Sequence, residues 1–101
     1  MELGQLGLGV WTVATRRYYP MERIRERGRA LIDQLDGRKV LIYIDPETNT
    51  PAALFVSALL GKMQDDEIHL DNGAAVRDGV LFDRRGKRVT VELPGCEIFG
   101  G

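Results

Sequence analysis

The sequence predicts a single small α/β domain of the α+β type, spanning residues 1–101, with a mixed sheet of about four or five strands. Two main helices are expected to alternate with the strands in the order β-α-β-α-β-β-β. Three observations favour this fold class. The chain has 101 residues, which is enough for one hydrophobic core. An amphipathic segment precedes a continuous apolar strand, and turn signals divide a β-rich second half.

The composition is that of an ordinary globular protein, with 44% hydrophobic residues, 29% charged residues and a net charge of −1. These values argue against a disordered or fibrous chain. No apolar run reaches the length of a membrane span, and Met1–Val10 has no basic region or cleavage signal, so we expect neither membrane insertion nor secretion. Cys96 is the only cysteine, so no internal disulfide forms and a cytoplasmic location is expected.

The first half of the chain is predicted to fold as strand, helix and strand. Val10–Thr15 is β-branched and aromatic and is predicted as the first strand. Pro20 is expected to begin a helix over residues 20–36, whose apolar positions recur at intervals of three and four, with Gly28 on the same stripe. Gly37 ends this helix. Because a helix then connects two strands, we expect a right-handed crossover and at least one parallel strand pair.

The middle of the chain is its most hydrophobic part. Lys39–Ile44 is a continuous apolar strand, a pattern typical of strands that are covered on both faces. Thr50 and Pro51 are expected to begin a second helix, which runs to Leu60 and ends at Gly61. Nearly every side chain of this helix would be apolar.

Shorter strands are predicted in the second half. Glu67–Leu70 alternates polar and apolar residues, and Asn72-Gly73 marks the turn that follows. Val80–Asp83 and Arg88–Leu93 are expected to form a hairpin around a basic tip. The two ends of the chain are expected to be loosely ordered, over residues 1–9 and 96–101.

The apolar helix predicted over residues 52–60 has more hydrophobic surface than one sheet can cover. Because exposed apolar side chains favour association with other apolar surfaces, we expect the chain to self-associate as a twofold dimer. The leading hypothesis is therefore a non-enzymatic module that acts by binding another macromolecule, in a protein–protein or regulatory role. In the alternative, the helix over 20–36 or the C-terminal hairpin covers this surface within one chain. The predicted interface residues are Leu54, Phe55, Val56, Leu59 and Leu60.

A nucleic-acid-associated protein is the second hypothesis, because arginine and tyrosine gather over residues 16–29 and the hairpin tip over 84–88 is basic. Guanidinium groups bind phosphates, and tyrosine rings stack on bases. The hypothesis predicts binding that weakens steeply as salt is added. The alternative is that these charges only face solvent. The candidate residues are Arg16, Arg17, Tyr18, Tyr19, Arg84, Arg85, Lys87 and Arg88.

A metal-dependent hydrolase or nuclease is the third hypothesis. Asp45 follows the buried strand, where a carboxylate can hold a divalent cation. Glu67, His69 and Asp71 share one face of the predicted strand, and together they could complete a site. The same alternation is also what a half-exposed strand requires. No catalytic residue and no cofactor are predicted.

The pattern of an apolar strand with an acidic end, then a loop and an apolar helix, resembles STAS-like regulatory domains over about residues 22–63. It is more distantly similar to the strand-to-helix unit of Clp-type proteases. Asp45-Pro46-Glu47 stands where that unit has a Gly-rich turn, and no nucleophilic serine occupies the expected position. No functional residue is carried over from either resemblance.

Overall fold

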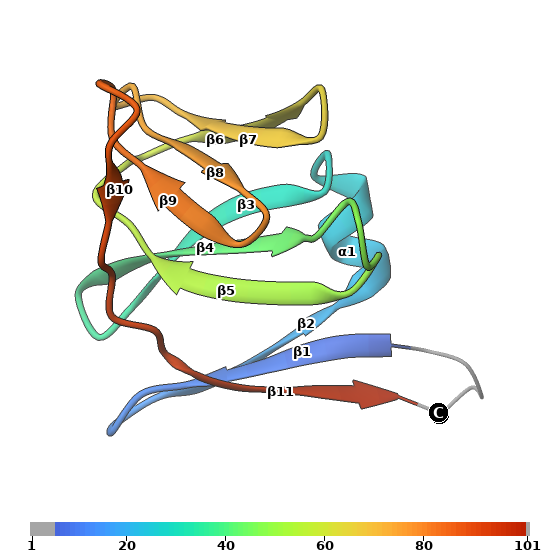
Figure 1. Ribbon diagram of the computed structural model, residues 1–101. Coiled ribbons are helices and arrows are strands. Elements are labelled where there is room, and N and C mark those ends of the chain that lie inside the picture. The colour runs from blue at the N-terminus through green and yellow to red at the C-terminus, as the bar shows by residue number, and fades with distance from the viewer. Residues whose placement is uncertain (1–5, 101) are drawn as a thin grey trace.

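The computed structural model describes residues 6–100, which form a three-layered stack of antiparallel sheets (Figure 1). Within these residues, eleven strands and one short helix make up the fold. The strands and the helix have the following bounds: β1 (Leu6–Trp11), β2 (Arg16–Pro20), α1 (Met21–Glu26), β3 (Ala30–Leu35), β4 (Arg38–Ile44), β5 (Pro51–Phe55), β6 (Gly61–Gln64), β7 (Glu67–Leu70), β8 (Ala75–Arg77), β9 (Val80–Phe82), β10 (Arg88–Val89) and β11 (Gly95–Gly100).

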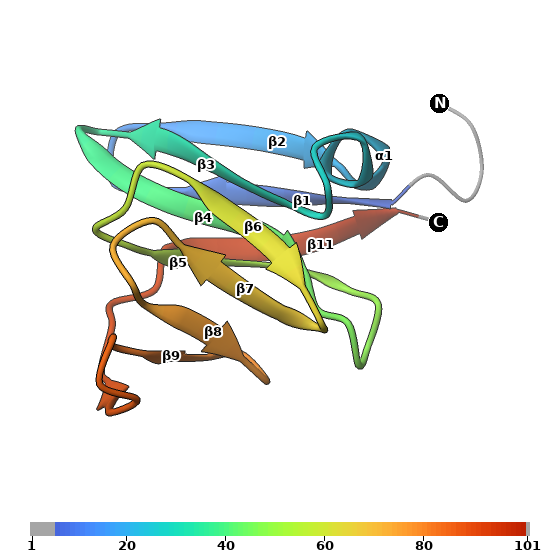
Figure 2. The same cartoon turned by 90° about the horizontal axis from the view of Figure 1, so that it is seen from above.

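The sheet β3-β4-β5 forms the middle layer of the stack, between the sheet β11-β1-β2 and the sheet β10-β9-β8-β7-β6 (Figure 1). Seen from above, α1 lies beside β1 and β2 at one end of the stack (Figure 2). Each β-strand pairs only in the antiparallel sense. The predicted α/β class, with its mixed sheet and parallel pair, is therefore wrong for this chain.

Two hydrophobic cores lie on the two sides of the middle sheet. The first fills the space toward β11-β1-β2 and α1, and contains Leu8, Val10, Tyr19, Met21, Ile24, Leu35, Val40, Ile42, Ile44, Ala53 and Phe55. The second lies toward β6–β10, and contains Ala30, Leu41, Tyr43, Leu54, Ala58, Ile68, Leu70, Ala74, Val76 and Leu81. Successive residues of a strand point to opposite faces, so β4 supplies both cores in alternation.

The strand β4 confirms one prediction from the sequence. Its residues Val40 to Ile44 are all buried, because both faces of the strand are covered. Burying a large apolar side chain stabilises a fold by about 1.5–3 kcal/mol. The middle of β4 therefore makes a large contribution to the stability of the whole stack.

Three hairpins are closed by two-residue turns whose backbone is left-handed at both positions. The turns are Asp36-Gly37 between β3 and β4, Asp65-Asp66 between β6 and β7, and Asp78-Gly79 between β8 and β9. Positive φ at both positions is the type I′ geometry, which matches the twist of the flanking strands. Aspartate and glycine favour it because they tolerate positive φ better than other residues.

The helix predicted over residues 20–36 is correct only in its first turns. It begins after Pro20, as expected, but α1 ends at Glu26. Gly28 and Arg29 then have φ values of +80° and +67°, which a right-handed helix does not allow. Gly28 therefore ends the helix, instead of lying in its interior, and the remaining residues form β3 against β4.

The second predicted helix does not exist. Pro51–Phe55 forms β5, which pairs with β4, and residues 56–60 connect it to β6. Its run of apolar residues reflects burial on both faces of the middle sheet, since Ala53 lies in one core and Leu54 in the other. The resemblance to STAS-like domains and Clp-type proteases depended on this helix, so the structure removes its basis.

The remaining predictions concern the shorter strands and the two ends of the chain. Glu67–Leu70 is β7 as predicted, and the hairpin with a basic tip is present as β9 and β10, although its second strand ends at Val89 and not at Leu93. The strand predicted over Val10–Thr15 is wrong in its bounds, because β1 ends at Trp11 and a turn leads to β2. Residues 6–9 and 96–100, which were expected to be loosely ordered, pair with each other in β1 and β11. Residues 1–5 and 101 lie outside the described part of the chain.

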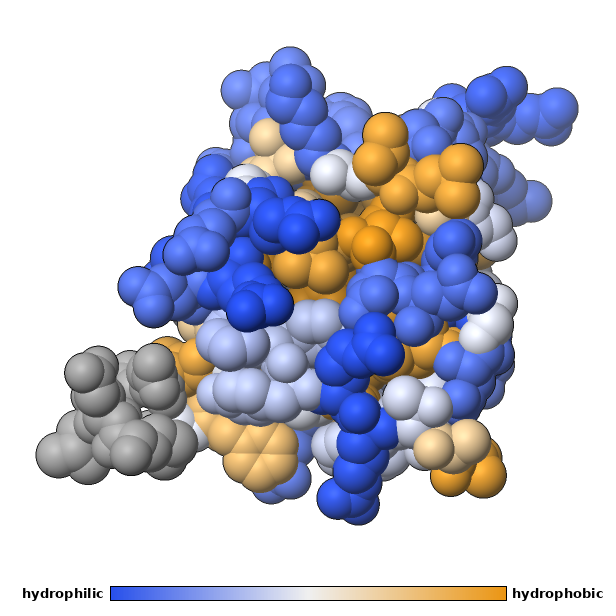
Figure 3. Space-filling view, turned by 180° about the vertical axis from the view of Figure 1, so that it is seen from behind, coloured by the Kyte–Doolittle hydropathy of each residue, from blue (hydrophilic) through white to orange (hydrophobic). Residues whose placement is uncertain are grey.

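The side of the molecule opposite to the view of Figure 1 is mostly hydrophilic, with hydrophobic side chains visible between polar ones (Figure 3). Among residues 6–100, α1 is too short to cross a membrane.

Candidate binding surface

The outer face of the sheet β11-β1-β2, which points away from the middle layer, carries three aromatic rings on three glycines. Gly7 and Gly9 alternate along β1 with Leu8 and Val10, whose side chains enter the first core. The glycines therefore face outward. Gly95 of β11 lies beside Trp11 of β1. The rings that lie on them are Tyr18 on Gly7, Phe99 on Gly9 and Trp11 on Gly95. We call these six residues the aromatic platform.

The glycines are required because the rings occupy the positions of their missing side chains. A Cβ atom at Gly7 would lie 2.1 Å from the Tyr18 hydroxyl oxygen, and one at Gly95 would lie 2.2 Å from Trp11 Nε1. At Gly9 it would lie 2.6 Å from Phe99 Cε2. Each distance is shorter than a van der Waals contact, so any other residue would displace the ring. The platform thus holds its rings directly against the sheet.

The two rings over β1 also contact each other. Tyr18 reaches over β1 from β2, and Phe99 reaches over it from β11. Their ring centroids are 6.3 Å apart at an interplanar angle of 66°, an edge-to-face geometry that aromatic pairs favour. Tyr18 and Phe99 nevertheless keep 48% and 46% of their surface exposed. The platform is both ordered by these contacts and open to a partner.

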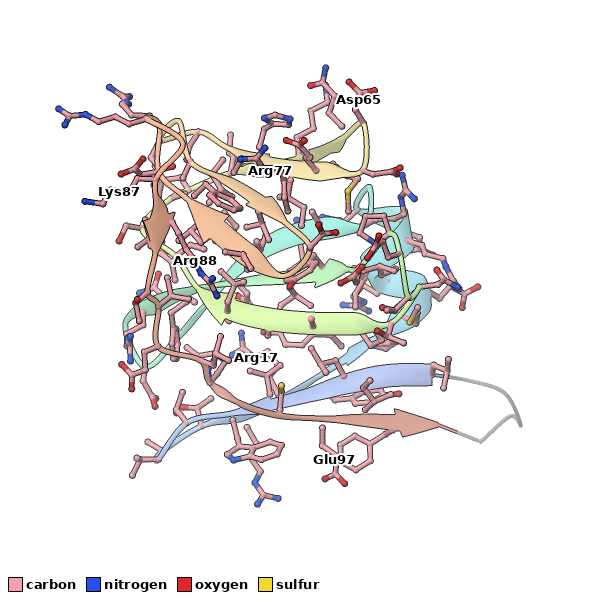
Figure 4. The ribbon with its side chains drawn as sticks, in the orientation of Figure 1. Arg17, Asp65, Arg77, Lys87, Arg88 and Glu97 are labelled. Carbon is pink, nitrogen blue, oxygen red and sulfur yellow. The ribbon has the colours of Figure 1, made fainter. Side chains whose placement is uncertain are left out.

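One positive and one negative side chain flank the rings. Arg16 lies opposite Trp11 on β2, and Glu97 lies opposite Gly9 on β11. Figure 4 shows Glu97 on the side of β11 that faces away from the other sheets. Within residues 6–100, neither Arg16 nor Glu97 has an ion pair. The platform therefore offers one cation and one anion to a partner.

The inner face of β2 is fixed to β3 by a polar cluster around Asp33. Arg17 Nη1 and the Tyr19 hydroxyl both donate to Asp33 Oδ2 at 2.7 Å. Partial burial opposes the ionisation of Asp33, but it is outweighed by these two hydrogen bonds together with the Gln34 N–H and the positive charge of Arg17, so the pKa of the carboxyl is lowered. Burial, together with the hydrogen bond to Asp33, raises the pKa of Tyr19. The cluster thus holds β2, and Tyr18 with it, in place.

The lowered pKa of Asp33 makes part of the stability depend on pH. An unfolded aspartate titrates near pH 3.9, and the folded carboxyl titrates below that value. The contribution is therefore complete above about pH 4 and is lost as the pH falls through the lower, folded value. We expect Asp33→Asn to cost about 1 kcal/mol near neutral pH, and the difference from the wild type to shrink in acid.

Urea unfolding followed by circular dichroism at a series of pH values measures this dependence. Glu22→Gln, on the exposed side of α1, is the matched control and should leave the pH profile unchanged. A difference between Asp33→Asn and the wild type that persists undiminished to the lowest pH would contradict the expectation.

The structure separates the residues of the nucleic-acid hypothesis. Tyr18 belongs to the platform and Arg16 flanks it, whereas Arg17 is paired with Asp33 and Tyr19 is buried. The four basic residues of the hairpin belong to the β9–β10 tip, on the outer sheet at the other end of the stack, where Figure 4 labels Lys87 and Arg88. The two basic segments therefore do not form one surface.

The hairpin tip itself has a well-defined backbone. Asp83 Oδ1 accepts hydrogen bonds from the backbone N–H groups of Arg85 and Lys87, both at 2.9 Å. Arg84 Nη2 donates to the Asn72 carbonyl at 3.3 Å. Within the described residues, the tip side chains make no ion pair. Nucleic-acid binding by residues 84–88 stays a prediction.

The residues of the metal hypothesis are not brought together. Asp45 Oδ1 accepts from the backbone N–H groups of Glu47 and Thr48, so it stabilises its own loop. Asp71 Oδ1 accepts from the Leu59 N–H at 2.9 Å, far along the chain from that loop. In the part of the chain that the structure describes, no three His, Cys, Asp or Glu side chains form a group that could hold a metal ion.

The two other members of that set lie on the outer face of β7. Glu67 Oε1 is 4.0 Å from His69 Nε2 and 3.9 Å from Arg77 Nε. The Arg77 guanidinium carbon lies 4.4 Å from the ring centre of Phe82. Glu67 thus has the positive charge of Arg77 near it, at the long end of the ion-pair range.

The predicted self-association residues fall into three groups. Leu54 and Phe55 are buried inside the stack, at 2% and 8% exposure. Val56 is half-buried in the second core. Leu59 and Leu60 are exposed, at 66% and 71%, in the segment between β5 and β6. The large apolar surface expected of residues 52–60 is therefore reduced to two exposed leucines.

A groove between β5 and β11 is lined mainly by apolar side chains, among them Ala53, Leu93 and Ile98. Cys96 also lines it; the residue is exposed, and the partial burial of its thiol raises the pKa. A raised pKa disfavours the thiolate and so disfavours a role as a nucleophile.

Sequence reasoning missed most of the platform. It selected Tyr18 and the flanking Arg16, but treated Gly7 and Gly9 as part of a loose end and gave Trp11, Phe99 and the flanking Glu97 no role. The available signal was the segment Leu6–Trp11, in which glycine alternates with apolar residues at the period of a strand. Gly95 and Phe99 had no such signal, because their place beside β1 comes from pairing between distant parts of the chain.

A comparison of this chain with protein-family models, curated proteins and solved structures finds no match in any of the three.

Proposed function

We propose that this chain is a non-enzymatic module that acts by binding another macromolecule, and that the aromatic platform is its contact surface. The observation that carries the proposal is the set of three outward-facing glycines, each covered by a ring. Exposed aromatic side chains are the residues that contribute most to binding at interfaces. Binding costs less conformational entropy when such side chains are already ordered, and packing on the three glycines orders these rings.

Two further features support a binding role in preference to catalysis. The face of β11-β1-β2 is open and formed by side chains on rigid strands, which position contact residues well. The only cysteine has a thiol whose pKa is raised, and the acidic candidates are used in loops and ion pairs. That single cysteine, Cys96, also supports a reducing compartment such as the cytoplasm.

Photo-crosslinking tests the proposal without knowledge of the partner. A benzophenone amino acid is placed at Tyr18 or at Phe99 in the full chain, which is expressed in cells and irradiated. We expect both positions to give discrete crosslinked species, which mass spectrometry identifies as this chain or as a different macromolecule.

Val13 is the matched control, because it is fully exposed in the turn between the same two strands but lies outside the platform. The same label at Val13 should give no discrete product. Equal products from all three positions, or none from Tyr18 and Phe99, would overturn the proposal.

A further inference from the structure

Resting on the proposed function, we infer that the partner of the aromatic platform is a second copy of this chain, packed face to face about a twofold axis. In this arrangement Arg16 of each copy meets Glu97 of the other. The inference combines the exposed aromatic rings of the platform with the opposite charges at its two sides.

The position of the charges makes the face complementary to itself. Arg16 is on β2 and Glu97 is on β11, so they lie on opposite sides of the central strand β1. A twofold axis that lies between the two faces, passes over β1 and is perpendicular to the line from Arg16 to Glu97 exchanges these two positions. Each arginine is then brought opposite the partner's glutamate, and the pairing occurs twice because a twofold interface is isologous.

The packing of the molecule itself also favours a sheet as the occupant. The middle sheet already packs face to face with a sheet on either side. Sheets pack in this way at about 10 Å when side chains fill the space between them. A second copy placed on the platform continues the same layering, with Trp11, Tyr18 and Phe99 filling the new space.

Other exposed surfaces are less suited to a second copy. The hairpin tip over 84–88 carries four basic side chains, which would repel the same tip of another chain. Leu59 and Leu60 are only two apolar residues, beside a loop that Asp71 already fixes. Of these surfaces, only the platform joins exposed aromatic rings with flanking charges of both signs, neither of which has an ion pair among residues 6–100.

A charge-exchange experiment tests the inference on the full chain. The variants Arg16→Glu and Glu97→Arg are made separately, and association is followed by sedimentation velocity over a range of concentrations. Each variant alone places like charges opposite each other, so its dimer should dissociate about tenfold more readily than that of the wild type. An equal mixture of the two variants should associate about as tightly as the wild type, because both pairs are then opposite in sign.

The mixture distinguishes pairing between copies from any effect within one copy. A contact between Arg16 and Glu97 of the same chain is broken in both variants, and mixing leaves it broken. Circular dichroism of each variant checks that the fold is retained. A wild-type chain that is monomeric at every concentration, or a mixture no tighter than the single variants, would overturn the inference.

The failure of this inference and the failure of the proposed function have different signatures. A monomeric chain that crosslinks from Tyr18 to a different macromolecule removes the second copy as partner but retains the platform as a binding surface. A monomeric chain with no product from Tyr18 or Phe99 removes both.

Discussion

Replacement of Ile42 by alanine is expected to lower the free energy of unfolding by about 2–5 kcal/mol, which is enough to unfold many small domains. Ile42 is completely buried, in the middle of the strand that both cores share. Truncation removes apolar contacts and leaves a cavity between the middle sheet and β11-β1-β2. Urea unfolding measured by circular dichroism gives the change directly.

Two variants complete this test. Leu41→Ala opens the other core, between the middle sheet and β6–β10, and should cost a similar amount. Val13→Ala changes a fully exposed side chain and should stay within about 0.5 kcal/mol of the wild type. If only one of the two core variants is destabilised, one face of β4 is not covered and the three-layered arrangement is incorrect.

Replacement of Gly9 by alanine is expected to lift the Phe99 ring off β1. The new methyl group would lie 2.6 Å from Phe99 Cε2, so the ring has to move. Overpacking of this kind costs about 1–3 kcal/mol. It also disrupts the edge-to-face contact with Tyr18, so we expect crosslinking from Tyr18 and association of the chain to weaken with it.

A double-mutant cycle with Phe99→Ala isolates the contact between ring and glycine. If the cost of Gly9→Ala comes from the ring, it should largely disappear in the background where the ring is absent. Unfolding free energies of the four chains measure this coupling. A cost that is the same in both backgrounds would show that Gly9 is needed for another reason, and that the ring does not depend on it.

The sequence was sufficient to recognise buried strands but not to distinguish all of them from helices. The run Lys39–Ile44 is rich in β-branched residues and was predicted correctly. The run after Pro51 contains alanine and leucine, which favour helices in isolation, yet it forms β5 because β4 offers it an edge to pair with. Burial on both faces removes the alternation that normally identifies a strand, so a short apolar run is ambiguous.

The strongest local signals that the sequence offered were the turns. Asp36-Gly37 and Asp78-Gly79 are typical of two-residue hairpins, and both occupy such turns in the structure. Recognition of Asp36-Gly37 as a hairpin would have placed a strand before it, where a helix was predicted. The apolar spacing over residues 20–36 favours a helix, and it suits the residues that do form α1. Because the same spacing continues through β3, it partly hides the alternation that is typical of that strand.

The candidate site could be predicted only in part, for a physical reason. Arg16 and Tyr18 are identified by their residue types alone. The significance of Gly7 and Gly9 depends on rings that come from β2 and β11, and the pairing of β1 with β11 joins segments from opposite ends of the described chain. Local patterns carry no information about such pairing.

That pairing also determines when the platform can exist. Closing β11 against β1 brings together residues separated by nearly the whole described chain, and contacts of this range form late because loop closure is costly in entropy. During synthesis, β1 and β2 emerge early. The edge of β1 that pairs with β11 stays unpaired until Gly95–Gly100 has been synthesised. Before then, Trp11 lacks Gly95 to pack on, and Phe99, which packs on Gly9, has not yet been added to the chain. A chain cut before Gly95 therefore lacks two of the three ring contacts, and if the platform is the contact surface that we propose, such a chain should not bind a partner through it.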